Sequence, residues 1–349
     1  MNIEELLTIA HDKGASDVHV TVGVPPILRI NGELEYLPYE ILLPDVTKGL
    51  IYPTMTDEYQ GVFEDKGEVD YSFAVPRLGR FRVNAFKQRG SVAAAFRLVA
   101  SEIPNPEKLG IPQSVVDLWS KKRGLVLVTG PTGSGKSTSL ASIINEINKN
   151  RSDHIITLED PIEYLHKHNK SIVNQREIGM DTQSYGNALK GALRQDPDVI
   201  LVGEMRDLET ISIAITAAET GHLVLSTLHT IGAVNTIDRI IDVFPPHAQQ
   251  QIRVQLSAVL VSVASQQLMR TIDGHGRAAA FEVMHTNPAI RNLIRENKSH
   301  QILSIMQTNK RMGMQTMDDA LLDLVRSGKI DRETAITYAQ DAPTLERRL

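Results

Sequence analysis

The stretch GPTGSGKS at residues 130–137 restricts the possible folds of this chain more than any other feature. It matches the phosphate-binding pattern G-x-x-x-x-G-K-[ST], known as Walker A, at every fixed position. An apolar run at 125–129 precedes it, and the predicted helix behind it has one apolar face formed by Leu140, Ile143, Ile144 and Ile147. A strand, a glycine-rich turn and a helix N-terminus in this order surround phosphate oxygens with backbone N–H groups. The sequence therefore predicts an α/β core that binds a nucleotide.

The chain beyond residue 118 alternates apolar strands with helical segments, which is typical of a parallel sheet with crossover helices. Strands are predicted at 125–129, 154–158, 199–202 and 223–227, and helices from about 136, near 184–194 and at 207–220. After Pro245-Pro246 we expect mainly helices, with one short strand at 281–284.

The first 100 residues have a different, mixed α/β pattern. A short helix is predicted at 3–13, and strands at 17–22, 27–37, 80–86 and 91–99, with Asn31-Gly32 as a hairpin turn. Residues 101–112 contain three prolines and a glycine and are predicted to link two domains.

Composition excludes several classes of protein. The chain has 349 residues and no cysteine, which rules out disulfides, a thiol nucleophile and a cysteine-ligated zinc. Its net charge of −5 argues against a protein that coats nucleic acid. The apolar stretch around 258–264 is interrupted by serines and is far shorter than the roughly 18 residues that cross a membrane. We therefore expect neither a membrane span nor a nucleic-acid partner, and the first residues do not resemble a signal peptide.

The phosphate loop predicts its own ligands. Lys136 is expected to reach the β- and γ-phosphates of ATP, and Ser137 to offer its hydroxyl to Mg²⁺. The predicted nucleotide-binding residues of this segment are Gly130, Pro131, Thr132, Gly133, Ser134, Gly135, Lys136, Ser137 and Thr138. ATP and Mg²⁺ are thus the expected cofactors.

The strand at 199–202 ends in an unusual way. In many proteins that hydrolyse ATP, such a strand ends in an aspartate that helps to hold Mg²⁺. Here Gly203 stands at that point and Glu204 follows it. Glu204 is expected to orient and polarise the attacking water. The alternative is a loop carboxylate that only forms a salt bridge with Arg206.

Two further segments are expected at the same edge of the sheet. TLEDPIEY at 157–164 ends a predicted strand and carries Glu159, Asp160 and Glu163, which suit a site with a cation, although a solvated acidic loop is the alternative. Glu159 is expected to contact the cofactor, and Glu163 is a second candidate for the catalytic base. In ETGHLVLSTLHT at 219–230, His229 follows the end of the strand. It is placed to donate a hydrogen bond to the γ-phosphate or to its bound water, and so to sense whether that phosphate is present. His222 enters the strand and is the weaker candidate for nucleotide contact, because a histidine beside an apolar strand is often structural.

These four motifs, in this order, resemble the secretion ATPase superfamily, the hexameric motors of type II and type IV secretion and of type IV pili. That superfamily has glycine in place of the strand-end aspartate, so the resemblance implies a working ATPase strand with Glu204 as its catalytic acid. GASDVHV at 14–20 and GRFRVNAF at 79–86 also resemble the superfamily's PAS-like domain. The resemblance implies a PAS-like domain at 1–100, a linker at 101–117, a RecA-like core at 118–285 and a helical C-terminal region at 286–349.

Two features indicate which members of the superfamily the chain resembles most. The stretch from 266 to 284 lacks the four-cysteine insertion of pilus extension and type II secretion motors, and AIRNLIRE at 289–296 is similar to the signature of the retraction motors that drive twitching motility. Within that segment Arg291 and Arg295 form a like-charge pair four residues apart, so we expect their partners elsewhere. The alternatives are an accessory pilus motor, another secretion ATPase, or a nucleotide-binding regulator without turnover.

The resemblance also implies the partners. In a homo-hexamer, Arg82 and Arg97, and less closely Arg80, would reach the ATP site of the neighbouring subunit, where a planar guanidinium suits phosphate. A solvated sheet face is the alternative. The chain would act on an inner-membrane platform protein of the pilus, with a related accessory ATPase as a further partner. It would thus be cytoplasmic and peripheral at the inner membrane.

Overall fold

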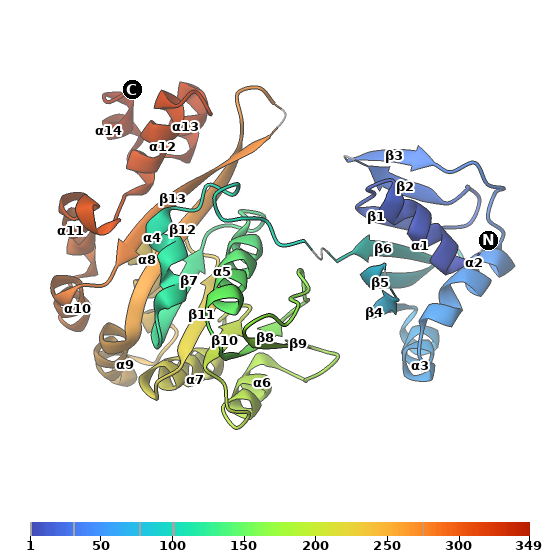
Figure 1. Cartoon of the computed structure of the whole chain (residues 1–349), viewed down its shortest axis with the longest axis horizontal. Coiled ribbons are helices and arrows are strands. Elements are labelled where there is room, and N and C mark those ends of the chain that lie inside the picture. The colour runs from blue at the N-terminus through green and yellow to red at the C-terminus, as the bar shows by residue number, and fades with distance from the viewer. Residues whose placement is uncertain (1, 31, 77, 100–101, 275) are drawn as a thin grey trace. The chain divides into compact units, whose positions relative to one another are not determined.

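The computed structural model describes residues 2–30, 32–76, 78–99, 102–274 and 276–349, and it divides into two compact units, Met1–Glu102 and Ile103–Leu349 (Figure 1). Asn31 of the expected hairpin turn and Ser101 of the expected linker lie outside the described residues. The expected fold class is confirmed, since one unit contains a largely parallel sheet covered by helices and the other a mixed α/β arrangement.

The first unit is built on an antiparallel sheet with the strand order β3-β2-β1-β6-β5-β4. Its strands are β1 Asp17–Val20, β2 Ile27–Ile30, β3 Glu33–Tyr36, β4 Glu68–Val75, β5 Gly79–Gln88 and β6 Ser91–Leu98. Its helices are α1 Ile3–Asp12, α2 Pro44–Ile51 and α3 Asp57–Lys66. α1 begins at a capping box formed by Asn2 and Glu5, and it buries Leu6 and Leu7. The sequence analysis missed β4, α2 and α3.

The second unit contains a seven-stranded sheet with the order β13-β12-β7-β11-β10-β8-β9, in which only β13 runs antiparallel to its neighbour. The strands are β7 Gly124–Thr129, β8 His154–Glu159, β9 Ile172–Glu177, β10 Val199–Val202, β11 Leu223–Leu228, β12 Leu260–Arg270 and β13 Arg277–His285. The helices up to β12 are α4 Gln113–Val116, α5 Lys136–Asn150, α6 Tyr185–Ala192, α7 Leu208–Glu219, α8 Ala233–Asp242 and α9 Pro246–Val259.

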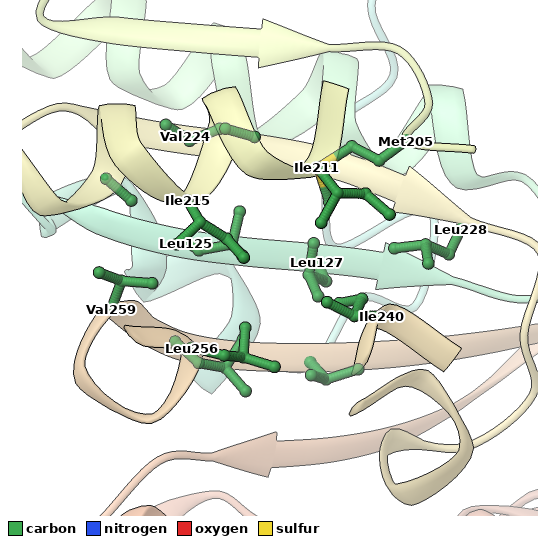
Figure 2. Packing of buried hydrophobic residues seen from close by; sticks show 14 of the residues in the cluster. Leu125, Leu127, Met205, Ile211, Ile215, Val224, Leu228, Ile240, Leu256 and Val259 are labelled. Carbon is green, nitrogen blue, oxygen red and sulfur yellow. The ribbon is translucent and has the colours of Figure 1, made fainter. Parts of the chain in front are cut away.

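Apolar layers cover both faces of this sheet. On β7, Leu125 and Leu127 face one layer, which Figure 2 shows packed against Ile211 and Ile215 of α7 and Leu256 of α9. Val126 and Val128 of the same strand face the other layer, together with Ile143 and Ile147 of α5. Because both faces are buried, the central strands are continuous apolar runs without alternation. This explains why they could be located from the sequence.

The chain after Pro245-Pro246 corrects the expectation of a mainly helical region with one short strand. β12 and β13 are long paired strands, with β12 hydrogen bonded to β7 on its other side. α9 passes into β12 without a loop, since Leu260 is extended directly after the last helical residue. The segment has no glycine or proline break, and β12 is buried almost along its whole length. The hydrophobic pattern of β12 therefore does not distinguish this strand from a buried helix.

The remaining helices are α10 Pro288–Arg295, α11 Ile302–Thr308, α12 Met317–Arg326, α13 Arg332–Tyr338 and α14 Ala342–Glu346. α12 packs against β13, and α10 packs against α9. Within the described ranges, no helix has the length and apolar character needed to cross a bilayer.

Candidate nucleotide-binding and hydrolysis site

The carboxyl ends of four parallel strands, β7, β8, β10 and β11, meet at one edge of the sheet of the second unit. A pocket of about 330 Å³ opens there. It brings together residues from all four predicted motifs: Thr132, Gly133, Lys136, Ser137, Glu159, Asp160, Glu163, Gly203, Glu204 and His229. In an open parallel sheet this edge is where ligands bind.

A second pocket, of about 480 Å³, shares Gly133, Lys136, Ser137 and Glu163 with the first. Its other lining residues are Lys108, Leu109, Gly135, Thr138, Ser139, Gln266, Leu268, Arg277 and Ala279. The two pockets therefore meet at the phosphate loop. Part of the expected linker belongs to this wall, because Leu109 lines the pocket and the Pro104 carbonyl accepts a hydrogen bond from Ser142 on α5.

The phosphate loop requires glycine for a steric reason. Gly130 has a φ of 141°, and a Cβ atom at this position would lie 2.1 Å from the Gln266 carbonyl oxygen on β12. No larger residue fits there. The loop is thus pressed against β12, and Ser139 of the following helix donates a hydrogen bond of 2.8 Å to the Gln266 side chain.

Lys136 is folded back onto the loop. Its Nζ donates to the carbonyl oxygens of Gly130 and Pro131, at 2.8 Å and 2.9 Å. Burial lowers the pKa of Lys136, and the carboxylates of Glu204 and Glu163 partly oppose that shift. In the same loop the Ser134 hydroxyl is buried and has no hydrogen-bond partner among the described residues. A buried cation and an unpaired hydroxyl make the loop a place for an anion.

Glu204 lies at the centre of a polar chain across the pocket. Its Oε2 is 2.8 Å from Arg206 Nη2 and 3.3 Å from His229 Nε2. The other ring nitrogen of His229 is 3.4 Å from the Thr132 hydroxyl of the phosphate loop. The salt bridge with Arg206 that the sequence analysis raised as an alternative is therefore present. Glu204 still lines the pocket, so the pairing orients this carboxylate without removing it from the site.

Glu159 and Glu163 of the acidic segment 157–164 have different surroundings. Burial raises the pKa of Glu159, whose Oε1 accepts hydrogen bonds from Thr157 Oγ1 at 2.6 Å and from Gln175 Nε2 at 3.0 Å. Glu163 is exposed at the meeting point of the two pockets. The Glu159 carboxyl group is thus engaged in hydrogen bonds within the protein, whereas the Glu163 carboxyl group is accessible to a ligand.

His222 lies apart from these groups. It precedes Leu223 at the start of β11, whereas His229 follows the end of the same strand. Its Nδ1 is 2.9 Å from the Ala217 carbonyl oxygen and 3.2 Å from the Thr220 hydroxyl. The fold therefore gives His222 local structural partners at the opposite edge of the sheet, and this position does not support nucleotide contact within one chain.

In the first unit, the register of the sheet places Arg82 of β5 directly opposite Arg97 of β6. Arg97 Nε donates to Asp17 Oδ1 at 2.8 Å, while the Arg97 side chain is 69% exposed. Arg82 lies 3.9 Å from Asp70 and is 45% exposed. Like charges in directly opposed positions weaken a sheet, and an anion between them would remove that cost. Arg80 lies two residues before Arg82 on the same strand.

AIRNLIRE lies on α10, with Glu296 as the C-cap, and the helix buries Ile290 and Ile294. Arg291 Nη1 donates to the Ser257 carbonyl oxygen and, at 2.6 Å, to that of Ala258. It thus caps the C-terminal end of α9, where free carbonyls and the helix dipole favour a cation. The expectation of a partner outside the segment is confirmed for Arg291.

Sequence reasoning missed several pocket residues, namely Tyr164, His166, Tyr185, Gln266 and Arg277. Gln266 had a signal, since a glutamine pair interrupts the apolar run of β12. Tyr164 and His166 come from a loop, Tyr185 from the start of a helix and Arg277 from the start of β13, where no periodicity marks a residue that faces a pocket.

His166 makes stability depend on pH. Burial lowers its pKa to about 4 from 6.5, so between these values the unfolded chain binds a proton that the native chain does not. The free energy of unfolding should therefore fall as the pH falls from 6.5 towards 4. We expect His166→Gln to reduce the loss between pH 7 and pH 5 by about 1–2 kcal/mol, measured by urea unfolding of the second unit. His300→Gln, an exposed control, should leave the loss unchanged; an equal effect of both variants would contradict this assignment.

Comparison with known proteins supplies the family context. A family profile described as type II/IV secretion system protein matches residues 80–278. The type IV pilus retraction ATPase PilT of Pseudomonas aeruginosa is 50% identical over 96% of this chain and 97% of its own length. The type IV pilus ATPase PilU of the same organism is 42% identical over 99% of this chain and 90% of its own. A crystal structure of the pilus retraction motor PilT with bound ADP has a TM-score of 0.93 and 52% identity, covering 99% of each chain.

Proposed function

The chain belongs to the type II/IV secretion system protein family, and from this premise we propose that it is an ATPase that powers retraction of a type IV pilus. The observation that carries the proposal is the similarity to PilT over nearly the whole of both chains. The pocket supports it, because the phosphate loop, Glu204 and His229 line it together.

ATP would occupy both pockets. The amides of residues 130–137 and Lys136 would hold the phosphates where the pockets meet. The adenine ring would enter the second pocket, where Leu109, Leu268 and Ala279 offer apolar surface and Arg277 a cation for stacking. Thr138, whose hydroxyl is 3.0 Å from that of Tyr164, follows the loop directly and would complete the phosphate-binding segment.

The donor set of the first pocket fits Mg²⁺, which prefers oxygen ligands and keeps several waters. Ser137 would bind it through its hydroxyl, with Asp160 and Glu163 as nearby oxygen groups. When bound, Mg²⁺ would neutralise charge on the phosphates. Gly203 contributes no ligand, so the protein's share of the coordination would be small.

Hydrolysis would depend on Glu204. Its carboxylate can accept a proton from water and turn that water towards the γ-phosphate. Arg206 and His229 both contact Oε2 of the carboxylate, and His229 also contacts Thr132 of the loop. A γ-phosphate beside Thr132 would therefore be sensed by His229. Glu163 remains the second candidate for the base.

We further propose that six subunits form a ring, in which Arg82 and Arg97, supported by Arg80, act on the ATP of a neighbouring subunit. Hydrolysis would change the orientation of the two units across the 101–112 segment. The ring would act on an inner-membrane platform protein and would be cytoplasmic, held at the membrane by that partner. A related accessory ATPase is a further proposed partner.

An accessory motor is the second candidate, because PilU is also similar over nearly the full length, although at lower identity. A regulator without turnover is disfavoured, since it would need neither Glu204 at the strand end nor its link to His229.

Deletion of the gene in its host should leave pili on the cell and abolish their retraction, measured by the pull on tethered beads and by twitching zones. The wild-type gene should restore retraction, whereas Lys136→Ala should not, because it removes the phosphate cation. Lys190→Ala, an exposed lysine on α6, is the matched control and should restore it. Retraction that persists at reduced force in the deletion strain would instead identify an accessory motor.

A further inference from the structure

The end of β10 contains a close approach between Gly203 and Tyr185. A Cβ atom on Gly203 would lie 2.8 Å from the Tyr185 hydroxyl oxygen and 3.1 Å from the Leu158 carbonyl oxygen. Gly203 is not among the residues with positive φ, so its backbone conformation is open to other amino acids. Steric contact, and not backbone conformation, therefore disfavours a side chain here, and the Tyr185 hydroxyl occupies part of the space that a side chain at position 203 would fill.

Tyr185 is held firmly in this position. It is the first residue of α6, directly after Ser184, whose side chain caps the helix by accepting from the Asn187 N–H. Its ring packs partly buried against the apolar layer that includes Leu158 and Val202. The residue nevertheless lines the first pocket together with Lys136, Ser137 and Glu204. The ring is thus anchored in the core while the residue reaches the site.

The surroundings of the hydroxyl are acidic. Burial raises the pKa of Tyr185, and the charges of Glu204, Asp160 and Glu159 raise it further, which keeps the phenol protonated at neutral pH. Among the residues that the structure describes, none forms a hydrogen bond with this hydroxyl. Its proton and its lone pairs are therefore available to molecules in the pocket.

We propose that Tyr185 takes the place of the acidic side chain that Gly203 lacks. Its hydroxyl accepts a hydrogen bond from one water molecule beside the bound phosphates and donates a hydrogen bond to a second. An aspartate at this place could only accept. The phenol therefore orders water without adding another negative charge to a pocket that already holds several carboxylates. Tyr185 is a positioning residue, and this inference rests on the proposed ATP site.

The steric part is tested without nucleotide, by a double-mutant cycle on thermal unfolding. Gly203→Ala should lower the Tm of the wild-type chain by about 3–8 °C, because its methyl group meets the hydroxyl. In a Tyr185→Phe background the hydroxyl is absent, and the loss should be less than half as large. Gly61→Ala on α3, which has open space around it, is the control and should cause no loss in either background. Equal losses from Gly203→Ala in both backgrounds would overturn the assignment.

The catalytic part is tested by separating kcat from KM in the full-length protein. Tyr185→Phe should lower kcat for ATP hydrolysis about 3–10-fold, as expected for one lost hydrogen bond. The KM for ATP, the Kd for ADP and the Tm should stay within about twofold or a degree of wild type, which a merely structural role would not predict. Tyr36→Phe, an exposed tyrosine of β3, serves as the control for loss of a phenol.

An unchanged kcat in Tyr185→Phe, with active wild-type protein, would overturn this inference and leave the proposed function intact. A weaker Kd for ADP with unchanged kcat would also overturn it, since the hydroxyl would then contact nucleotide and not water. A wild-type protein without turnover would instead refute the proposed function, and the role of Tyr185 in hydrolysis with it.

Discussion

Glu204→Gln is expected to lower kcat for ATP hydrolysis by about 10²–10⁴-fold while ATP still binds. Glutamine keeps the shape of the side chain but cannot accept a proton from water. Glu204 follows the end of β10, in contact with Arg206 and His229, and it lines the pocket that contains Lys136. Phosphate release at saturating ATP gives kcat, titration with a fluorescent nucleotide gives Kd, and light scattering reports the assembly.

Two matched variants make this result specific. Glu163→Gln changes the other candidate base, which is more exposed and lies where the two pockets meet. Glu209→Gln changes an exposed glutamate that pairs with Lys190 on the surface, and it should hydrolyse ATP normally. If Glu204→Gln turned over at the wild-type rate and Glu163→Gln did not, Glu163 would be the base, and β10 would end in a structural carboxylate.

Arg97→Ala should also nearly abolish turnover, by about 10³–10⁵-fold if this arginine stabilises transition-state charge as an arginine finger. The guanidinium is exposed and held in direction by Asp17, and it lies opposite Arg82 in the sheet of the first unit. Arg82→Ala keeps the pair of Arg97 with Asp17 and is the companion variant. Turnover and assembly are measured as for Glu204→Gln, so that loss of the proposed ring is distinguished from loss of chemistry.

Mixing inactive variants then tests whether a site is shared between subunits. In an equimolar ring of Arg97→Ala and Glu204→Gln subunits, about one boundary in four would combine an intact arginine with an intact Glu204, so activity should reappear. A mixture of Glu204→Gln with Lys136→Ala changes only the core unit and should regain far less at the same boundaries. If co-assembly were demonstrated and no activity returned with Arg97→Ala, the arginine would not act across a boundary.

The sequence predicted those parts of the fold whose residues carry a local reason for their structure. β7, β8, β10 and β11 are short apolar runs between turn residues, and the phosphate loop has a fixed pattern. β12 was missed because α9 continues into it without a break and because burial on both sides removes the alternation of a strand. β4 and the helices α2 and α3 were missed because each depends on packing within the first unit.

The site shows the same division. Lys136, Glu163, Glu204 and His229 were expected at one edge because parallel strands end together, and they line one pocket. His222 shares a motif with His229, but the length of β11 places the two at opposite ends of the strand. Tyr185 had no signal, because its position depends on the helix that follows β9 and on the missing side chain of Gly203. Such a contact exists only after the fold has formed.

The paired edges of β12 have a mechanical consequence. This strand is hydrogen bonded to β7 along one side and to β13 along the other, and Gln266 at its middle touches the phosphate loop. A force along the strand axis would act on both sets of interstrand hydrogen bonds in shear. Many of these bonds would then resist together, because they could not break one after another. Tension applied through α12, which packs on β13, would therefore reach the nucleotide with little stretching of the sheet between them. A motor that pulls on a filament needs a stiff connection between the surface where the force acts and the site where the nucleotide binds.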